Sequence, residues 1–188
     1  MRRSERSPLE TIVAQGSVTD FDVKGGTTAW VAASLTSPGQ LFVHGGGSTP
    51  QALTTIGHDV FAEAPLAPAE QFSFPGWNEE TMHGYVVKPQ DFVPGHKYPV
   101  AFLIHGGPHG SFGNAWSYRW NPQVWASMGY AVVMIDFHGS SGYGEDFGRA
   151  IVGHWGDRPL EDLKKGWASA LQRCDWLDSS RACALGGS

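Results

Sequence analysis

The sequence predicts an α/β fold that follows an all-β segment, and three apolar runs in the second half of the chain are the main reason. Two of them, Pro99–Ile104 and Tyr130–Ile135, are apolar without interruption, and a shorter one, Ala182–Leu185, lies close to the last residue. Strands that are apolar on both faces are typical of sheets covered by helices on both sides. Because helices are expected between the runs, the order indicates a parallel or mixed sheet with right-handed crossovers.

The first of these helices has recognisable ends. Asn121 is a suitable N-cap, Pro122 suits the first helical position, and Gly129 suits the position after the last turn. These three residues predict a short helix over Gln123–Met128.

The second helix is longer and is expected to begin near Pro159. Glu161 and Asp162 lie in its first turn and Arg173 lies in its last, as the helix dipole favours. Its apolar residues fall on one face, which we expect to pack on the sheet: Leu160, Leu163, Trp167, Ala170 and Leu171.

The first part of the chain, from Thr11 to Ile56, shows short apolar or alternating stretches separated by turn residues. This pattern predicts antiparallel strands, with turns at Lys24–Gly26 and Ser37–Gly39. Strands at this spacing suit one blade of a β-propeller or a small sandwich. The expected strands are Val18–Val23, Ala29–Ser34 and Leu41–His44.

A linker is expected at Ala62–Ala69, where prolines lie among alanines. Beyond it, Gln71–Phe74 and Met82–Lys88 are expected to pair as antiparallel strands around the turn Gly76–Asn78. The chain therefore divides into an all-β part with its linker, residues 1–68, and an α/β part, residues 69–188.

Composition excludes several classes of function. The chain has 188 residues, of which 41% are hydrophobic and 16% charged, as in globular proteins. Its net charge of -5, without a basic stripe, argues against binding to nucleic acid. No apolar run approaches the ~20 residues that span a bilayer, and no signal peptide is recognisable at the N-terminus. Cys174 and Cys183 are expected to remain unpaired.

The strand Pro99–Ile104 runs directly into His105, Gly106, Gly107 and Pro108. Two glycines at the end of a strand allow a tight turn that points backbone N–H groups outward. Acyl transfer requires such donors for the oxyanion that develops on the substrate. Gly107 is therefore a candidate oxyanion donor.

The strand Ala182–Leu185 ends in Gly186, Gly187 and Ser188, which are the first three residues of a G-x-S-x-G nucleophile elbow. Small residues are needed there because the strained turn brings neighbouring backbones close together. Ser188 is therefore the candidate nucleophile, in a fold that reads as the first half of an α/β-hydrolase domain.

The chain resembles the prolyl oligopeptidase family of serine peptidases, and within it the secreted fungal dipeptidyl-peptidases. The resemblance rests on these segments: Tyr98–Pro108, Asp136–Gly144, Gly153–Gly156, Asp162–Leu163 and Asp178–Ser188. It implies a β-propeller remnant before a truncated α/β-hydrolase domain, secretion of the protein, and hydrolysis of peptide bonds through an acyl-enzyme. It implies no cofactor and no metal.

The family pattern matches Ser188 to the nucleophile and Gly107 to a backbone oxyanion donor. The second donor, the aspartate and the histidine follow the serine in that family, so we expect this chain to be a fragment that is inactive alone. Two alternatives stay open: a non-catalytic truncated gene product, or an esterase or lipase of the same fold.

Other residues carry weaker hypotheses. His105 and His109 have the spacing of metal ligands on a helix, but the glycines and proline between them exclude a helix. Asp136 is expected to cap the Gly139–Gly144 loop rather than to act in catalysis. That glycine-rich loop lacks the lysine and the spacing of a nucleotide site. Tyr143 and Trp155 are open between lining a substrate pocket and packing in the core.

Overall fold

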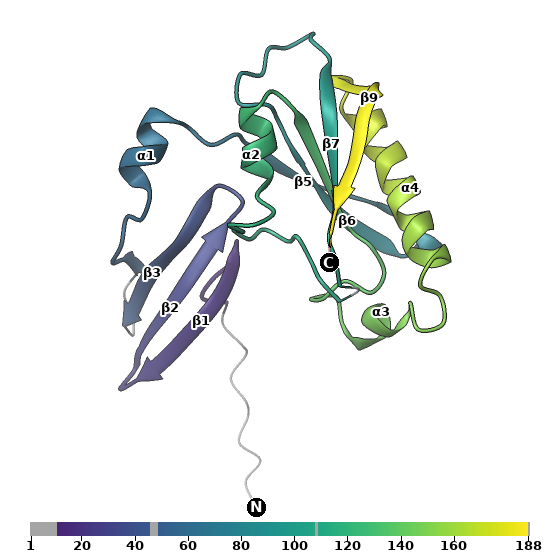
Figure 1. Cartoon of the computed structure of the whole chain (residues 1–188). Coiled ribbons are helices and arrows are strands. Elements are labelled where there is room, and N and C mark those ends of the chain that lie inside the picture. The colour runs from purple at the N-terminus through teal and green to yellow at the C-terminus, as the bar shows by residue number, and fades with distance from the viewer. Residues whose placement is uncertain (1–10, 46–48, 108, 188) are drawn as a thin grey trace, which may run out of the picture.

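The computed structural model describes residues 11–45, 49–107 and 109–187 and arranges them around two sheets (Figure 1). The first sheet is antiparallel with the order β1-β2-β3-β4, and its strands follow one another along the chain. Its strands are β1 (Ser17–Lys24), β2 (Thr27–Ser34), β3 (Ser37–Gly45) and β4 (Gln51–Ala52).

The second sheet is mixed, which is one of the two alternatives that the sequence leaves open, and has the order β5-β6-β8-β7-β9. The central strand β8 pairs antiparallel with β6 and parallel with β7, which in turn pairs parallel with the edge strand β9. The antiparallel pair β5 and β6 is joined through a short 3₁₀ turn, η1 (Trp77–Glu79). The strands are β5 (Ala69–Pro75), β6 (Thr81–Val87), β7 (Tyr98–Ile104), β8 (Ala131–Asp136) and β9 (Leu177–Gly186).

The described helices are α1 (His58–Glu63), α2 (Pro122–Ser127), α3 (Glu145–Arg149) and α4 (Asp157–Arg173). Only α2 and α4 are predicted from the sequence. The helices α1 and α3 are single short turns that bury at most one residue, so they carry too little apolar periodicity to be recognised. None of the helices in the described part of the chain is long and apolar enough to span a membrane.

The ends of α2 are those that its sequence predicts. The Asn121 side chain accepts a hydrogen bond from the Gln123 backbone N–H at 3.0 Å, and Pro122 occupies the first turn. Gly129 follows the helix with a φ of 85°, a conformation that glycine adopts without steric cost. Local capping chemistry therefore sets both ends of this helix.

The buried residues of β8 alternate between the two faces of the sheet. Val133 and Ile135 pack with α4 on one face, whereas Val132 and Met134 pack with α2 on the other. Successive side chains of a strand point to opposite faces, so an uninterrupted apolar strand requires a core on each side.

The sheet-facing side of α4 differs in part from the predicted stripe. Leu163, Trp167, Ala170 and Leu171 pack on the core, but Leu160 is 48% exposed. The helix instead approaches the sheet at Gly166, where a Cβ atom would lie 2.2 Å from the Ile135 Cδ1 atom. Gly166 sets the position of this contact, although a pattern of apolar residues along the helix does not include it.

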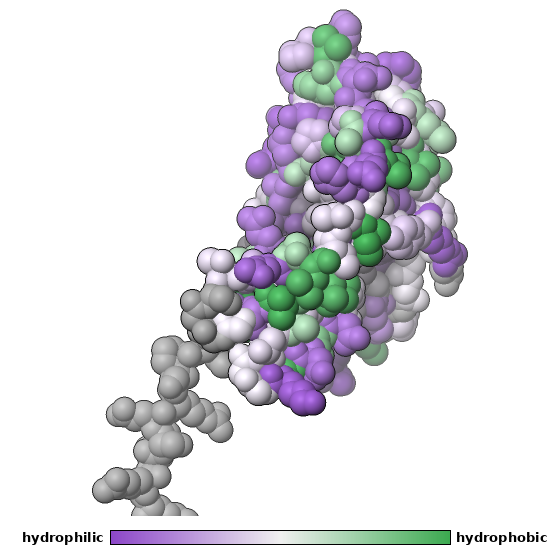
Figure 2. All heavy atoms as spheres, turned by 90° about the vertical axis from the view of Figure 1, so that its left-hand side faces the viewer, coloured by the Kyte–Doolittle hydropathy of each residue, from purple (hydrophilic) through white to green (hydrophobic). Residues whose placement is uncertain are grey.

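One of the two turns predicted for the all-β sheet is wrong. The turn at Gly25–Gly26 is confirmed, but Ser37–Gly39 lies within β3, and the turn falls at Leu35 and Thr36 instead. The reason is tertiary, because Leu35 is only 3% exposed and packs in the core on the α2 side of the second sheet. Figure 2 faces the side that carries the first sheet and shows hydrophobic side chains among hydrophilic ones on its surface.

The last part of the edge strand β9, from Ala182 to Leu185, is apolar but largely uncovered in the described structure. Ala182, Cys183 and Ala184 are exposed, and a groove of about 340 Å³ lies between β9 and α4, lined in part by Phe102 and Trp167. Both cysteines are free thiols, as the sequence predicts.

The junction between the two sheets depends on the buried amide of Gln123. Its Oε1 atom accepts from the Ala67 N–H at 2.8 Å, and its Nε2 atom donates to the carbonyl oxygens of Leu35 and Ala67 at 3.0 Å each. The Leu35 N–H donates to Asn114 Oδ1 at 3.0 Å. The turn of the first sheet is thus bonded on both sides to the second part of the chain.

We expect Gln123→Leu to lower the free energy of unfolding by roughly 3 kcal/mol, because it leaves one buried N–H and two buried carbonyl groups without partners. Urea denaturation followed by tryptophan fluorescence measures the change. Gln172→Leu, at an exposed amide on α4, is the control and should change stability by no more than about 0.5 kcal/mol. Equal effects of the two substitutions would show that the Gln123 contacts contribute nothing to the junction.

Candidate active site

The two candidate motifs follow strands that lie side by side. Ile104 at the end of β7 is the register partner of Gly186 at the end of β9, and because the strands are parallel, the chain leaves both at the same edge of the sheet. A Cβ atom on Gly186 would lie 2.3 Å from the Ile104 carbonyl oxygen, so only glycine allows this approach. Figure 1 shows the C-terminal end of β9 beside the loops at this edge.

Gly107 is described, whereas its neighbour Pro108 and the predicted nucleophile Ser188 lie outside the described residues. Gly107 is exposed, and its N–H donates no hydrogen bond to any described residue. The φ of Gly107 is 146°, and a Cβ atom there would lie 2.5 Å from the backbone nitrogen of His109. Glycine is therefore required at this position both by the backbone conformation and by the space.

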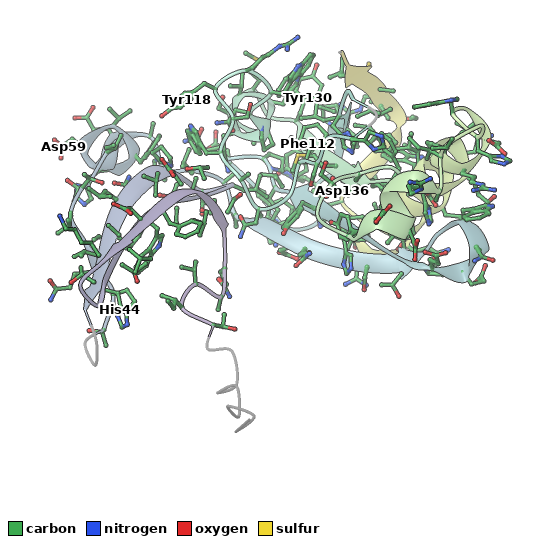
Figure 3. All side chains as sticks on the ribbon, turned by 90° about the horizontal axis from the view of Figure 1, so that it is seen from below. His44, Asp59, Phe112, Tyr118, Tyr130 and Asp136 are labelled. Carbon is green, nitrogen blue, oxygen red and sulfur yellow. The ribbon has the colours of Figure 1, made fainter. Side chains whose placement is uncertain are left out.

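The carboxylate of Asp136, at the end of β8, holds the loop that follows Gly107. Its Oδ1 atom accepts from the Phe112 N–H at 3.0 Å, and its Oδ2 atom accepts from Ser111 Oγ at 2.6 Å and from the Tyr143 hydroxyl at 2.8 Å. Asp136 is 4% exposed and lies next to Phe112, as Figure 3 shows. The bond from Tyr143 is the predicted contact of Asp136 with the Gly139–Gly144 loop. The other two hydrogen bonds of Asp136, from Ser111 and Phe112, extend to a different loop.

Further hydrogen bonds join the same two loops directly. The Ser141 N–H donates to the Gly110 carbonyl at 2.9 Å, and the Ser141 hydroxyl donates to the His109 carbonyl at 2.5 Å. The Nδ1 atom of His109 lies 2.9 Å from the Gly139 carbonyl oxygen. The glycine-rich loop therefore serves to support the loop that carries Gly107.

Burial is the main cause of a raised pKa at Tyr143, with the nearby Asp136 charge and the hydrogen bond to Asp136 adding to it. Burial likewise raises the pKa of Tyr85, again with a contribution from Asp136. Both phenols are disfavoured in their ionised form, mainly because burial penalises the charged form and also because a second negative charge would lie close to a buried carboxylate. Tyr143 therefore remains a hydrogen-bond donor to Asp136.

His105 is held between the two loops. Its Nδ1 atom lies 2.9 Å from the Gly106 carbonyl oxygen, and its Nε2 atom lies 2.7 Å from Ser140 Oγ. His109 bonds to a different carbonyl, so the two rings do not form the paired metal ligands that their spacing could suggest. No cluster that could hold a metal ion occurs among the residues that the structure describes.

A second buried cluster, which sequence reasoning missed, lies behind this edge. His138 is completely buried, its Nδ1 atom lies 2.7 Å from Asp162 Oδ2, and its Nε2 atom lies 3.3 Å from Glu80 Oε2. The backbone N–H groups of Trp77 and His138 also donate to Asp162. The helix α4 begins at Asp157, so Asp162 lies beyond the first turn in which the sequence predicts it. Because the charged Glu161 precedes it, no local apolar pattern indicates the burial of Asp162.

The two aromatic residues that the sequence left open differ in their surroundings. Tyr143 packs against the core, with its ring centroid 4.9 Å from that of Phe147, and it donates to Asp136. Trp155 is 60% exposed. Tyr143 therefore packs against the core, whereas Trp155 lies on the surface.

Parts of this chain are similar to known sequences. Residues 116–188 match the prolyl oligopeptidase family. The chain is 45% identical over 111 residues to the probable dipeptidyl-peptidase 5 of Emericella nidulans, and 43% identical over 119 residues to dipeptidyl-peptidase 5 of Schizosaccharomyces pombe. The alignments cover 59% and 63% of this chain but 15% and 17% of those relatives. The resemblance predicted from the motifs is thereby confirmed.

Solved structures confirm the predicted fold class. An acylaminoacyl peptidase in complex with Z-Gly-Gly-Phe-chloromethyl ketone is similar with a TM-score of 0.84 and 26% identity, over 93% of this chain and 27% of that one. Acylaminoacyl peptidase from Pyrococcus horikoshii is similar with a TM-score of 0.82 and 26% identity, over 93% of this chain and 28% of that one. The similarity covers the all-β segment as well as the α/β part.

We expect the free energy of unfolding to fall as the pH rises above 10.0, the ordinary tyrosine pKa, because the unfolded chain loses the Tyr143 proton before the folded chain does. The stabilisation is present below this pH and is lost as the pH rises through the raised pKa. Tyr143→Phe should make the alkaline decline shallower in urea denaturation at several pH values. Tyr118→Phe, at a side chain that is 85% exposed, should leave it unchanged. Identical slopes in wild type and Tyr143→Phe would contradict the assignment.

Proposed function

We propose that the full-length protein that carries this chain is a serine peptidase, because residues 116–188 match the prolyl oligopeptidase family. The observation that supports the proposal most is the register of Ile104 with Gly186, which brings the ends of the strands before the two candidate motifs together. The exposed Gly107 N–H, without an acceptor among the described residues, is available to a ligand at the same edge.

In the proposed reaction, the Ser188 hydroxyl oxygen bonds to the carbon of a peptide carbonyl while its proton passes to a general base. The Gly107 N–H donates to the oxygen that becomes negative. The carbon–nitrogen bond then breaks, the amine leaves with the proton from the base, and water hydrolyses the acyl-enzyme.

We propose that the aspartate and histidine of the triad follow Ser188 in the full-length protein, since serine, acid and histidine occur in that order on this fold. The surroundings of His105 and His138 support this. Both ring nitrogens of His105 face the Gly106 carbonyl and Ser140, and His138 is buried between Asp162 and Glu80. Neither ring has a nitrogen free to accept the proton of a nucleophile.

The substrate is proposed to be a peptide from which dipeptides are released, because similar proteins carry the name dipeptidyl-peptidase. Residues 1–68 are proposed to be part of a β-propeller with its linker, and residues 69–188 the first half of the catalytic domain. Secretion of the full-length protein is proposed on the same family grounds.

We expect a peptidyl diphenyl phosphonate to label the full-length protein at Ser188 and to inhibit release of dipeptides from a chromogenic peptide substrate, because the phosphorus reacts only with an activated serine. Ser188→Ala should abolish both the label and the activity. The 188-residue chain alone should not be labelled, since loss of the base costs about 10⁶-fold in turnover. Mass spectrometry locates the label, and hydrolysis of esters without any hydrolysis of peptides would indicate an esterase instead.

We also expect Gly107→Ala to lower the turnover of the full-length protein by roughly 10²-fold, because a Cβ atom forces the turn to move and displaces the N–H donor. The matched control is Gly95→Ala. Gly95 also has a positive φ, of 83°, but no atom lies within 4 Å of the position of its Cβ. Unchanged turnover in Gly107→Ala would contradict the role of the Gly107 N–H as an oxyanion donor. Equal losses of turnover in both variants would indicate an effect of general backbone strain.

A further inference from the structure

The orientation of the Gly107 N–H is determined by the peptide group that it shares with the Gly106 carbonyl. The described chain contains no cis peptide bonds, so the carbonyl of Gly106 and the N–H of Gly107 point in opposite directions within one plane. Any side chain that fixes the direction of the Gly106 oxygen therefore also fixes the direction of the candidate oxyanion donor.

His105 makes this contact. Its Nδ1 atom lies 2.9 Å from the Gly106 oxygen, and because a carbonyl oxygen can only accept, Nδ1 must carry the hydrogen. Gly110 also lies against this oxygen, because a Cβ atom there would lie 2.5 Å from the Gly106 oxygen and 2.9 Å from His105 Nδ1. The imidazole donor and the backbone of the same loop are thus packed together at this carbonyl.

The surroundings of the second ring nitrogen are compatible with this tautomer. His105 Nε2 lies 2.7 Å from Ser140 Oγ and 3.7 Å from Asp136 Oδ1. Asp136 already accepts hydrogen bonds from Ser111, Phe112 and Tyr143. The Ser140 hydroxyl can donate to Nε2, which leaves Nε2 without a hydrogen and Nδ1 as the donor.

The ring has little freedom to turn away from this geometry. The His105 side chain is 6% exposed, and its ring stacks on Phe137 with centroids 4.2 Å apart and planes at 13°. Phe112 packs against it edge-on at 5.7 Å. Packing and hydrogen bonds together hold the imidazole in one orientation.

We propose that His105 is a positioning residue for acyl transfer, which orients the Gly107 N–H by donating from Nδ1 to the Gly106 carbonyl. The proposal rests on the proposed function for its consequence in turnover, but the tautomer and the peptide orientation can be tested without activity. His105 acts through the backbone and does not contact the substrate.

Two substitutions separate the functions of the two nitrogens. In His105→Asn, the side-chain amide nitrogen can occupy the place of Nδ1 and donate to Gly106. In His105→Gln, the longer side chain places its polar atoms near Nε2 and loses the donor to Gly106. We expect His105→Gln to lower kcat of the full-length protein by about 10²-fold with little change in KM, and His105→Asn to retain most of the activity.

A tautomer measurement on the 188-residue chain tests the geometry independently. Long-range ¹H–¹⁵N correlation spectra, assigned by the signals that disappear in His105→Asn, should show His105 protonated at Nδ1 and unprotonated at Nε2 near neutral pH. An Nε2–H tautomer or a doubly protonated ring would overturn the proposal.

The combined outcomes distinguish this proposal from the proposed function. A wild-type protein that lacks peptidase activity and serine labelling, yet has the Nδ1–H tautomer, would refute the peptidase and retain the positioning of the peptide group. Equal losses in His105→Asn and His105→Gln, with both variants folded by circular dichroism, would refute the role of the Nδ1 donor. A His105→Gln variant that fails to fold leaves the tautomer measurement to decide.

Discussion

The buried carboxylate of Asp136 is the group on which the arrangement of the sheet edge depends. A buried carboxylate is costly unless donors surround it, and removal of such partners typically costs several kcal/mol. Ser111, Phe112 and Tyr143 supply those donors from two different loops. The need to satisfy one charge at the end of β8 therefore brings both loops to the place where β7 also ends.

A similar constraint operates behind this edge at Asp162. Its carboxylate joins α4 to the backbone of Trp77 and to both the backbone and the ring of His138. Hydrophobic packing sets the layers of the α/β part, but it is non-directional. Buried polar groups, including Gln123 at the junction with the first sheet, give the loops and layers their relative positions.

These constraints suit the proposed chemistry, because electrostatic stabilisation of an oxyanion requires donors that are oriented before the reaction begins. The Gly107 N–H lies on a loop bonded to the sheet edge by Asp136 and to the glycine-rich loop by Ser140 and Ser141. The first sheet reaches the same loop through the bond between Leu35 and Asn114. A shift of the glycine-rich loop or of the first sheet would therefore move the loop that carries the Gly107 N–H.

The sequence by itself determined a parallel or mixed sheet, the capped helix after Asn121, and Gly107 and Ser188 as candidates, because periodicity, caps and motifs are local properties. Tertiary structure decided that Leu35 forms a turn, that Leu160 is exposed, and that Asp136, His105 and Asp162 are structural centres. The long-range hydrogen bonds of Leu35, Asp136, His105 and Asp162 reach partners between 24 and 88 residues away along the chain. A sequence pattern records which groups need a partner, whereas only the folded chain determines which distant group supplies it.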